Sequence, residues 1–376
     1  MKKLRFAILP IILSALFIDS PGSLDSQGLE KPAVMYNDGP YVYFSGKMLY
    51  VSYILDENGQ KTVKTDSSAL SEKAGKSLDV STDEAGKTFH VILKQNIQVE
   101  KAEYSMPKKL LIMSDFEGNF GGLRKMLQAN KVIDENLDWI YGEGHLVFIG
   151  DLVDRGDQVT EVLWLIYSLE EKAKKAGGYV HYVLGNHEIM NLSGDLRYLN
   201  PKYVENAKLM NRHFMTLYGV NSELGRWLRS KNIMEKVGSF TFMHGGISPE
   251  ITRMDIDIWN INNMARGFYD DTLYVYPNPK VDTIYGEKGP FWYRGYYTKP
   301  DSAVDTEIAE SLSKFHVKHV VTGHTIVADT VSMWYGGKVF NVDTHHQKGH
   351  SEALMVEGKS IYRVNAEGEK KLLKSD

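Results

Sequence analysis

The feature that most constrains this chain is a series of short apolar runs that each stop at a polar residue. Residues 146–149 read LVFI, stop at Gly150 and are followed by Asp151, Asp154 and Arg155. Such runs are typical of strands that are buried on both faces of a parallel sheet. Because α/β folds bind ligands beyond the carboxyl ends of their strands, these charged residues indicate a site. Taken alone, they would also fit a solvated acidic loop.

Two further runs repeat this arrangement at a regular spacing. Residues 108–114 lead to Asp115, and residues 179–184 lead through one glycine to Asn186. Asp151 lies 36 residues after Asp115 and 35 residues before Asn186. This spacing is the length of one strand–helix–strand unit, so we expect the three polar ends to lie side by side.

Helices are expected between and after these strands. Apolar residues recur at helical spacing over residues 120–127 and again over residues 159–169, and the second helix should end before Gly177. Residues 189–235 predict a mostly helical insertion. Later apolar runs lead to His244 and His324, and the C-terminal part predicts β-hairpins.

The N-terminal third has a different character. Residues 1–27 predict a signal peptide, because the basic stretch KKLR precedes an apolar segment, residues 6–18, that is too short for a stable spanning helix. We expect export to the periplasm, or a membrane anchor if the signal is not cleaved. Residues 34–105 predict a small β-rich accessory module, with turns at three glycines. Residues 106–376 predict the main domain, in which strands and helices follow one another and which includes the insertion at 189–235.

Charge and cysteine content exclude several function classes. The formal net charge is −4, so no basic field favours nucleic acid as a partner. The chain has no cysteine, which excludes disulfides and thiolate metal sites. Any metal must therefore be held by histidine, aspartate, glutamate, asparagine or backbone atoms.

The expected strand ends carry only oxygen and nitrogen donors. They are Asp115, Glu117, Asp151, Asn186, His244 and His324. Carboxylates mixed with imidazoles suit ions of the manganese, iron and zinc class better than calcium. A carboxylate that bridges two such ions, about 3.5–4 Å apart, helps them to clamp a phosphate and to generate hydroxide, and Asp151 is the central candidate. Each residue alone also fits an ordinary role as a helix cap, turn residue or buried histidine.

Five short motifs follow the expected strands. They are DFEGN from Asp115, GDLVDRG from Gly150, GNHE from Gly185, HGG from His244 and GH from Gly323. Together they resemble the motifs of the calcineurin-like metallophosphoesterases, in the phosphoprotein-phosphatase branch, over about residues 108–345. The segments GNHEIMNLSGDLRY, ELGRWLRS and GPFWYRGY are similar to bacterial Shewanella-like phosphatases. The resemblance implies an α/β fold, a four-layer αββα sandwich with a metal pair between its two sheets.

The resemblance also implies a role for each site residue. Asp115 and Glu117 would bind the first metal, Asp151 would bridge, and Asn186, His244 and His324 would bind the second. His187 would protonate the leaving oxygen, oriented by Asp154. Arg155, Arg294 and Asn186 would bind the phosphate. An imidazole beside a carboxylate keeps a proton available near neutral pH, and arginines match phosphate oxygens with paired donors.

Two departures from the family pattern leave alternatives open. Glu117 stands where the family usually has histidine. Either it adds a carboxylate, which favours manganese, magnesium or iron over zinc, or it does not reach the metal and the first site is weak or vacant. Thr344 is followed by histidine where related chains often have glycine, so His345, His346 and His350 border the pocket or form a surface cluster.

The expected function is that of an exported phosphatase that hydrolyses phosphate monoesters by direct attack of a metal-bound hydroxide. Manganese, or an iron–manganese pair, is the expected cofactor, with zinc or magnesium as alternatives. The substrate is a phosphorylated small molecule or phosphoprotein, and the aromatic residues around Arg294 would receive an aryl phosphate such as phosphotyrosine or pack as a lid. The alternatives are a phosphodiesterase, a dinucleoside polyphosphate hydrolase, or a phosphoryl-binding protein without turnover. No stable membrane insertion of the mature chain is expected.

Overall fold

Two six-stranded sheets form the centre of the computed structural model, which describes residues 36–298 and 302–375. The first sheet contains, in spatial order, β17 (Lys370–Ser375), β16 (Ser360–Asn365), β15 (Glu352–Glu357), β7 (Lys109–Met113), β8 (His145–Ile149) and β9 (Tyr179–Val183). The second contains β13 (Ser332–Trp334), β14 (Val339–Asn341), β12 (His319–Thr322), β11 (Phe240–Met243), β10 (Met234–Val237) and β6 (Glu103–Tyr104). The strands β7, β8 and β9 are parallel, as are β11, β12 and β14.

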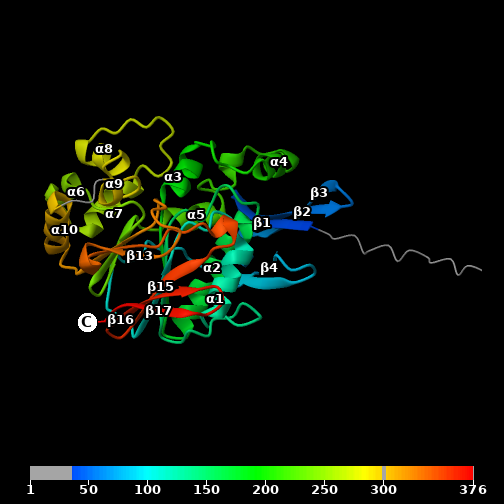
Figure 1. The fold of residues 1–376 in the computed structure, drawn as a ribbon. Helices are drawn as coiled ribbons and strands as arrows, with labels where there is room; N and C mark the ends of the chain where they lie inside the picture. The colour runs from blue at the N-terminus through cyan, green and yellow to red at the C-terminus, as the bar shows by residue number, and fades with distance from the viewer. Residues whose placement is uncertain (1–35, 299–301, 376) are drawn as a thin grey trace, which may run out of the picture. The chain divides into compact units, whose positions relative to one another are not determined.

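Helices cover the outer face of each sheet. The helices α1 (Phe120–Ala129) and α2 (Val159–Lys175) lie on one side, and α6 (Pro249–Arg253), α7 (Ile258–Arg266) and α10 (Ser302–Phe315) lie on the other (Figure 1). Between the sheets, Val147 of β8 and Phe242 of β11 belong to one buried hydrophobic cluster. The predicted four-layer αββα sandwich is thereby confirmed.

The strand β8 shows why the sequence signal was strong. Leu146 and Phe148 are buried in the cluster shared with α1 and α2, whereas Val147 and Ile149 are buried between the sheets. Because both faces are covered, the strand is apolar at every one of these positions. The predicted strands and the helix that ends before Gly177 are confirmed.

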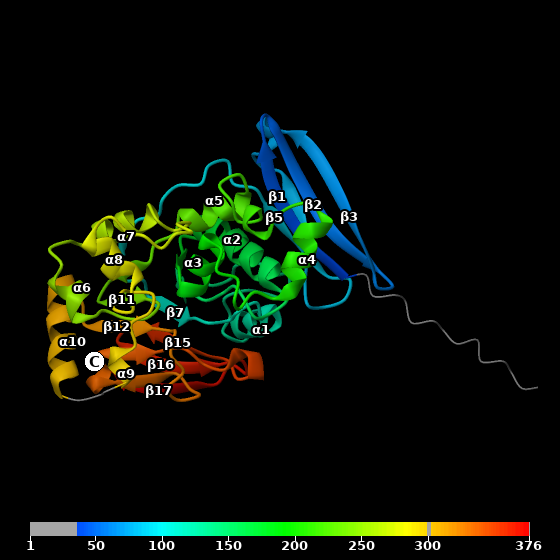
Figure 2. The ribbon, with the colours of Figure 1, turned by 90° about the horizontal axis from the view of Figure 1, so that it is seen from above.

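The N-terminal strands form two small antiparallel sheets that pack on α2 (Figure 2). They are β1 (Tyr36–Ser45), β2 (Met48–Glu57) and β3 (Gln60–Ala69), then η1 (Leu70–Glu72), β4 (Ser77–Ser81) and β5 (Thr88–Ile92). The predicted turns at Gly46, Gly59 and Gly86 are confirmed. The indole of Trp164 on α2 donates a hydrogen bond to the carbonyl of Pro40 at 2.8 Å. The boundary at residue 105 between accessory module and main domain stays a prediction.

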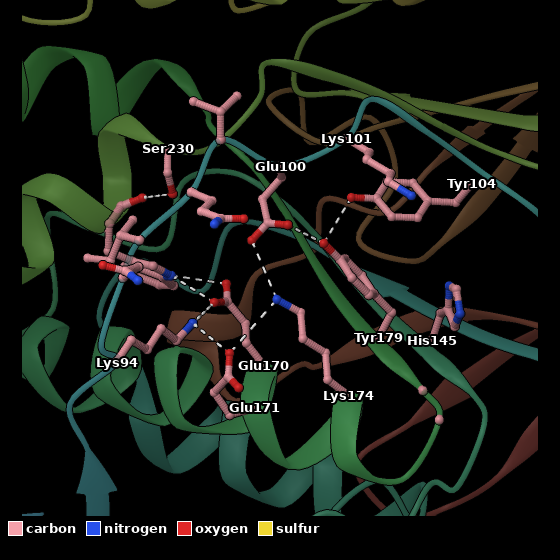
Figure 3. Close-up of a pocket in the computed structure, with 17 residues that line it drawn as sticks. Lys94, Glu100, Lys101, Tyr104, His145, Glu170, Glu171, Lys174, Tyr179 and Ser230 are labelled. Atoms are coloured by element: carbon pink, nitrogen blue, oxygen red, sulfur yellow. Dashed lines mark hydrogen bonds and ion pairs between the residues drawn. The ribbon is translucent and has the colours of Figure 1, made fainter. Parts of the chain in front are cut away.

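Buried ion pairs fix the segment that runs from β5 to β6. Lys94 contacts Glu170 of α2, and Glu100 accepts a hydrogen bond from the hydroxyl of Tyr179 on β9 (Figure 3). Glu170 also pairs with the buried Lys231 at 2.6 Å. The segment lines a cavity of about 650 Å³ that includes the first residues of β8 and β9. This cavity therefore lies at the opposite strand ends from the sequence motifs.

The remaining elements connect and flank the sheets. Residues 189–235 are mostly helical, as predicted, with α3 (Asn186–Ser193), α4 (Pro201–Leu209), η2 (Phe214–Thr216) and α5 (Glu223–Arg229). The others are α8 (Pro279–Tyr285), α9 (Gly295–Thr298), η3 (Tyr335–Gly337) and η4 (His346–Lys348). Within the described ranges no helix has the length and apolar character that a membrane crossing needs. The predicted signal peptide lies outside the described residues.

A buried acid on α2 should make stability depend on pH. Glu161 is buried near Asp38 of β1, and its Oε2 atom has no hydrogen-bond partner among the described residues. Burial, and then the charge of Asp38, raise the pKa of Glu161 from 4.5 to about 8. The folded chain therefore holds this proton more tightly than the unfolded chain does.

We expect the Glu161 contribution to the free energy of unfolding to fall as pH rises from about 4.5 to about 8. A glutamine at this position carries no charge, so Glu161→Gln should gain stability relative to the wild type as pH rises. Urea unfolding of both proteins at about pH 5 and about pH 8 measures this change. A stability difference that stays constant between the two pH values would contradict the expectation.

Candidate active site

The carboxyl ends of strands from both sheets meet around one cavity of about 330 Å³. Asp115, Asp151 and Asn186 follow β7, β8 and β9 of the first sheet, and the second sheet contributes residues that follow β11 and β12. The predicted site residues that line the cavity are Asp115, Glu117, Asp151, Arg155, Asn186, His187, Arg294 and His324. The other two, Asp154 and His244, are fully buried behind it.

Six of these residues have a left-handed backbone conformation, which residues other than glycine rarely adopt. Their φ angles are +56° at Asp115, +47° at Glu117, +52° at Asp151, +72° at Asp154, +54° at Arg155 and +67° at His324. Each such residue costs about 1–2 kcal/mol relative to ordinary backbone. Hydrogen bonds hold the loops in place, because the N–H of Asp115 donates to Gly150 and the N–H of Glu117 donates to Asp151, both at 3.0 Å.

The approach of the loops after β8 and β9 requires glycine. Gly150 has a φ of +77°, and a Cβ atom placed on it would lie 2.3 Å from the backbone nitrogen of Gly185. A Cβ atom on Gly185 would in turn lie 2.2 Å from Oδ1 of Asp151. Both glycines of the sequence motifs are therefore needed for the carboxylate and the next loop to come together.

Two imidazoles and a carboxylate form the deepest part of the site. The Nδ1 atom of His244 bonds the carbonyl of Ile149 at 2.7 Å, which turns Nε2 toward Oδ2 of Asp151 at 3.0 Å. The Nδ1 atom of His324 lies 3.2 Å from the same Nε2. Burial lowers the pKa of His244, but the charges of Asp151 and Asp115 outweigh it and raise the pKa to about 10. Burial, and then the charge of His244, lower the pKa of His324 to about 2, so only the His244 ring of this pair favours a positive charge.

His187 is oriented by a carboxylate and an amide. Its Nδ1 atom lies 2.7 Å from Oδ2 of Asp154, and Asn191 donates to the other Asp154 oxygen at 2.6 Å. Because a carboxylate only accepts, Nδ1 carries a proton and Nε2 faces Asp151 at 3.6 Å. Burial lowers the pKa of His187, but Asp151 and Asp154 outweigh it, so the pKa lies above 6.5. This imidazole is suited to donate a proton near neutral pH.

Two arginines stand at the cavity wall. The guanidinium of Arg155 forms an ion pair with Glu117 and lies 5.2 Å from the ring centre of Tyr198. Arg294 donates to the carbonyl of His324 at 2.8 Å and to the hydroxyl of Thr325 at 2.9 Å. Arg155 is thus held beside a carboxylate, and both cations line the cavity that an anion would enter.

The donor atoms fit a pair of metal ions. Two buried atoms of the cavity wall, Oδ1 of Asn186 and Nε2 of His324, have no hydrogen-bond partner in the described part of the chain. Such atoms cost about 1–3 kcal/mol each unless they bind something. Two groups of ligand atoms lie within 4.8 Å of one another, namely Asp151 with His244 and His324, and Glu117 with Asp151 and His187. Asp151 is the member that both groups share.

Comparison with known proteins identifies the family. The sequence profile described as Calcineurin-like phosphoesterase matches residues 108–328, which is more than half of the chain. The chain belongs to the calcineurin-like phosphoesterase family. Members of this family bind two metal ions, and the chain is accordingly a hydrolase that acts on phosphate esters.

Solved structures resemble this phosphoesterase over most of its length. A cold-active protein tyrosine phosphatase superposes with a TM-score of 0.81 at 34% identity, covering 91% of this chain and 98% of that chain. The cold-active protein-tyrosine phosphatase of a psychrophilic Shewanella species gives a TM-score of 0.80 at 35% identity, covering 90% and 100%. Shewanella-like protein phosphatase 1 of Plasmodium berghei is 28% identical over 228 residues, which are 58% of this chain and 61% of that protein.

Glu188 supports the site of this phosphoesterase, although sequence reasoning gave it no role. Its buried carboxylate accepts the N–H groups of Asp151 at 2.9 Å, Leu152 at 2.7 Å and Gly185 at 2.7 Å, and the hydroxyl of Tyr182 at 3.0 Å. It therefore fixes the loop after β8 against the loop after β9. Its place in the GNHE motif was the available signal.

Asp343 is a further buried carboxylate, which was not predicted from the sequence. It lies two residues after β14 and lines the cavity. Burial, and then the charge of Asp115, raise the pKa of Asp343 well above its ordinary value. Because residues 338–343 read KVFNVD, the pattern of an apolar run that ends at an acid was present there too.

The histidines after Thr344 divide between the two interpretations. His345 and His346 line the cavity, and the buried ring of His346 stacks on Phe116 with centroids 3.9 Å apart. His350 is not part of the lining. The pocket interpretation therefore holds for two of the three residues in this phosphoesterase.

The mouth of the cavity carries apolar side chains. Tyr198 and Ile326 line it and are each 44% exposed, and Trp292 lies beside them with its ring 5.7 Å from that of His324. The other aromatic residues expected near Arg294 do not line the cavity. Of these, Phe291, Tyr293 and Tyr296 are buried, and Tyr297 bonds Thr322 at 2.7 Å. The aromatic group is thus mostly packing, with one indole at the site.

Proposed function

We propose that this chain is a metal-dependent phosphatase of phosphate monoesters, with aryl phosphates such as phosphotyrosine as its preferred class. The observation that carries the proposal is the pair of His187 and Asp154, 2.7 Å apart, beside a cavity lined by carboxylates and arginines. A proton donor, metal-type ligands and phosphate-binding cations in one cavity are the parts that ester hydrolysis requires.

The ligands are assigned as the fold and the donor types suggest. Asp115 and Glu117 would hold the first ion. Asn186, His244 and His324 would hold the second ion, and Asp151 would contact both. Bound ions would supply Lewis acidity and a nucleophilic water near neutral pH. We propose manganese, or an iron–manganese pair, because oxygen donors outnumber imidazoles in this set.

The protein's own residues handle the phosphate and the proton. Arg155 and Arg294 would bind the phosphate oxygens and offset their charge as the ester bond breaks. His187 would give the proton on Nε2 to the leaving oxygen. Asp154 holds the other ring nitrogen and would stabilise the imidazolium until that transfer. Asn191 keeps the Asp154 carboxylate in position, since it donates to the oxygen that His187 does not use.

The preference for aryl phosphates rests on the mouth of the cavity. Tyr198, Trp292 and Ile326 offer apolar faces where the alcohol part of an ester would leave the cavity. Two similar structures, at 34% and 35% identity, are protein tyrosine phosphatases, which supports the same class here. A flat phenyl group gains more from such a mouth than the short chain of phosphoserine.

We further propose that residues 1–27 direct export to the periplasm and that residues 34–105 serve as an accessory module. The basic start and the short apolar segment of residues 6–18 support export. The accessory role is supported by the strands of this region, which pack on α2 and contribute no residue to the lining of the cavity that holds the proposed metal ligands.

Metal removal tests the proposed function. Chelation of the purified chain should abolish hydrolysis of p-nitrophenyl phosphate, and added manganese should restore it better than zinc does. Bis(p-nitrophenyl) phosphate should be hydrolysed more slowly than the monoester. Faster turnover of the diester would replace the proposal with a phosphodiesterase, and phosphate binding without turnover under any metal would indicate a binding protein.

A further inference from the structure

The ion pair of Glu117 and Arg155 joins a proposed metal ligand to a proposed phosphate ligand. The side chain of Glu117 is 10% exposed, whereas that of Arg155 is 45% exposed. Within residues 36–298 and 302–375, Arg155 is the one cation that pairs with the Glu117 carboxylate. Hydrolysis as proposed above needs each of the two side chains, but it assigns no role to the contact between them.

The Glu117 carboxylate reaches the proposed metal site while it is paired with Arg155. Its ligand atom lies within 4.8 Å of the ligand atoms of Asp151 and His187. A carboxylate has two oxygens and about four lone-pair sites, so it can accept from a guanidinium and bind an ion at the same time. The ion pair therefore leaves Glu117 available as a ligand.

Hydrogen bonds restrain the main chain on both sides of this ion pair. The carbonyl of Glu117 accepts from the N–H of Gly156 and from the side-chain amide of Gln347, both at 2.8 Å. The N–H of Arg155 donates to the carbonyl of Tyr198 at 3.0 Å. Because the two loops are held in this way, the contact between the side chains is what sets the direction of the Glu117 carboxylate.

We propose that Arg155 positions Glu117 as a ligand of the first ion, an inference that rests on the proposed function. A glutamate side chain loses rotamer freedom when it binds an ion, and a partner that already orients the carboxylate reduces that cost. Histidine, which the family usually has at this position, could not be oriented by an arginine. An imidazole that binds an ion through one nitrogen has only a donor at the other.

The direction of the change in metal affinity distinguishes positioning from charge. An arginine repels a nearby cation, so loss of its charge alone should strengthen metal binding. Loss of a residue that orients a ligand should weaken metal binding, by about tenfold or more. Arg294 provides the matched control, because it lines the same cavity but donates to a carbonyl and a hydroxyl instead of a carboxylate.

Calorimetric titration of manganese into the chelator-treated full chain, without phosphate, tests the inference. E117Q should weaken one binding step and so identify the step to which Glu117 contributes. R155Q should weaken the same step about tenfold, and R155K should restore part of the affinity because an ammonium also pairs with a carboxylate. R294Q should not weaken that step. In the E117H background, R155Q should no longer weaken metal binding, since an imidazole does not depend on the arginine.

Three results would overturn the inference. Unchanged or stronger manganese binding by R155Q would mean that Arg155 does not position the ligand. Equal weakening by R155Q in the wild-type and E117H backgrounds would indicate a general disturbance of the site. Full affinity of E117Q for both ions would mean that Glu117 is not a ligand. The proposed function fails separately, if the wild type binds manganese but hydrolyses no phosphate ester, and the titrations then still decide the role of Arg155.

Discussion

The His187→Asn variant is expected to hydrolyse phenyl phosphate about 10²–10⁴ times more slowly than the wild type. Asparagine can still bond Asp154 but has no proton to give to the leaving oxygen. The loss should be smaller for p-nitrophenyl phosphate, whose leaving group departs without protonation. Steady-state kinetics with both esters therefore report on the acid role itself, because a merely structural defect would lower both rates equally.

A matched variant separates proton donation from loss of the fold. His90→Asn removes an exposed histidine that contacts Asp79 on the N-terminal sheets, and it should leave both rates unchanged. Metal content of His187→Asn should equal that of the wild type if the residue is not a ligand. An equal loss with both esters, or a loss of bound metal, would rule out the assignment of His187 as the general acid.

Asp151→Asn is expected to weaken metal binding more than about 100-fold and to remove most turnover. Asp151 is the residue that both groups of ligand atoms share, and its carboxylate lies 3.0 Å from Nε2 of His244. Asparagine keeps one oxygen to accept the N–H of His187, now at 3.0 Å, so the loop should survive. Metal titration followed by calorimetry measures the change directly, without reliance on turnover.

Asp138→Asn is the control for that measurement. Asp138 is an exposed carboxylate that pairs with Lys172 at 2.8 Å, outside the lining of the cavity. Its replacement removes the same charge from the chain as Asp151→Asn does. Because Asp138 lies outside the cavity lining, the metal affinity should stay at the wild-type value. If Asp151→Asn binds two ions as tightly as the wild type, Asp151 is not the shared ligand and the metals occupy other donors.

The layers of the fold were accessible from the sequence because the central strands are buried on both faces. In β8, alternate side chains face the helices and the second sheet, so the run had no polar interruption until Asp151. Short or half-exposed elements left no such signal. β6 has two residues, and β17 has a mostly exposed pattern, so neither was predicted.

The proposed site was only partly accessible from the sequence. Strand-end polar residues brought Asp115, Asp151 and Asn186 together, since the parallel order of the strands fixes where they end. Supporting contacts, such as the five hydrogen bonds that the Glu188 carboxylate accepts, depend on how loops fold over one another, and no periodicity in the sequence reports them. The pairing of Glu117 with Arg155 is of the same kind, because it joins two loops that meet only in the folded chain.

The left-handed residues of the site also bear on how this chain can change over generations. Asp115, Glu117, Asp151, Asp154, Arg155 and His324 all have positive φ, and glycine would relieve the backbone at each. Selection for thermal tolerance alone should therefore accumulate glycine or asparagine at these six positions. Lineages that still carry charged or imidazole side chains there would be those in which turnover continues to be selected. The residue types at these six positions therefore indicate whether a descendant is still selected for turnover.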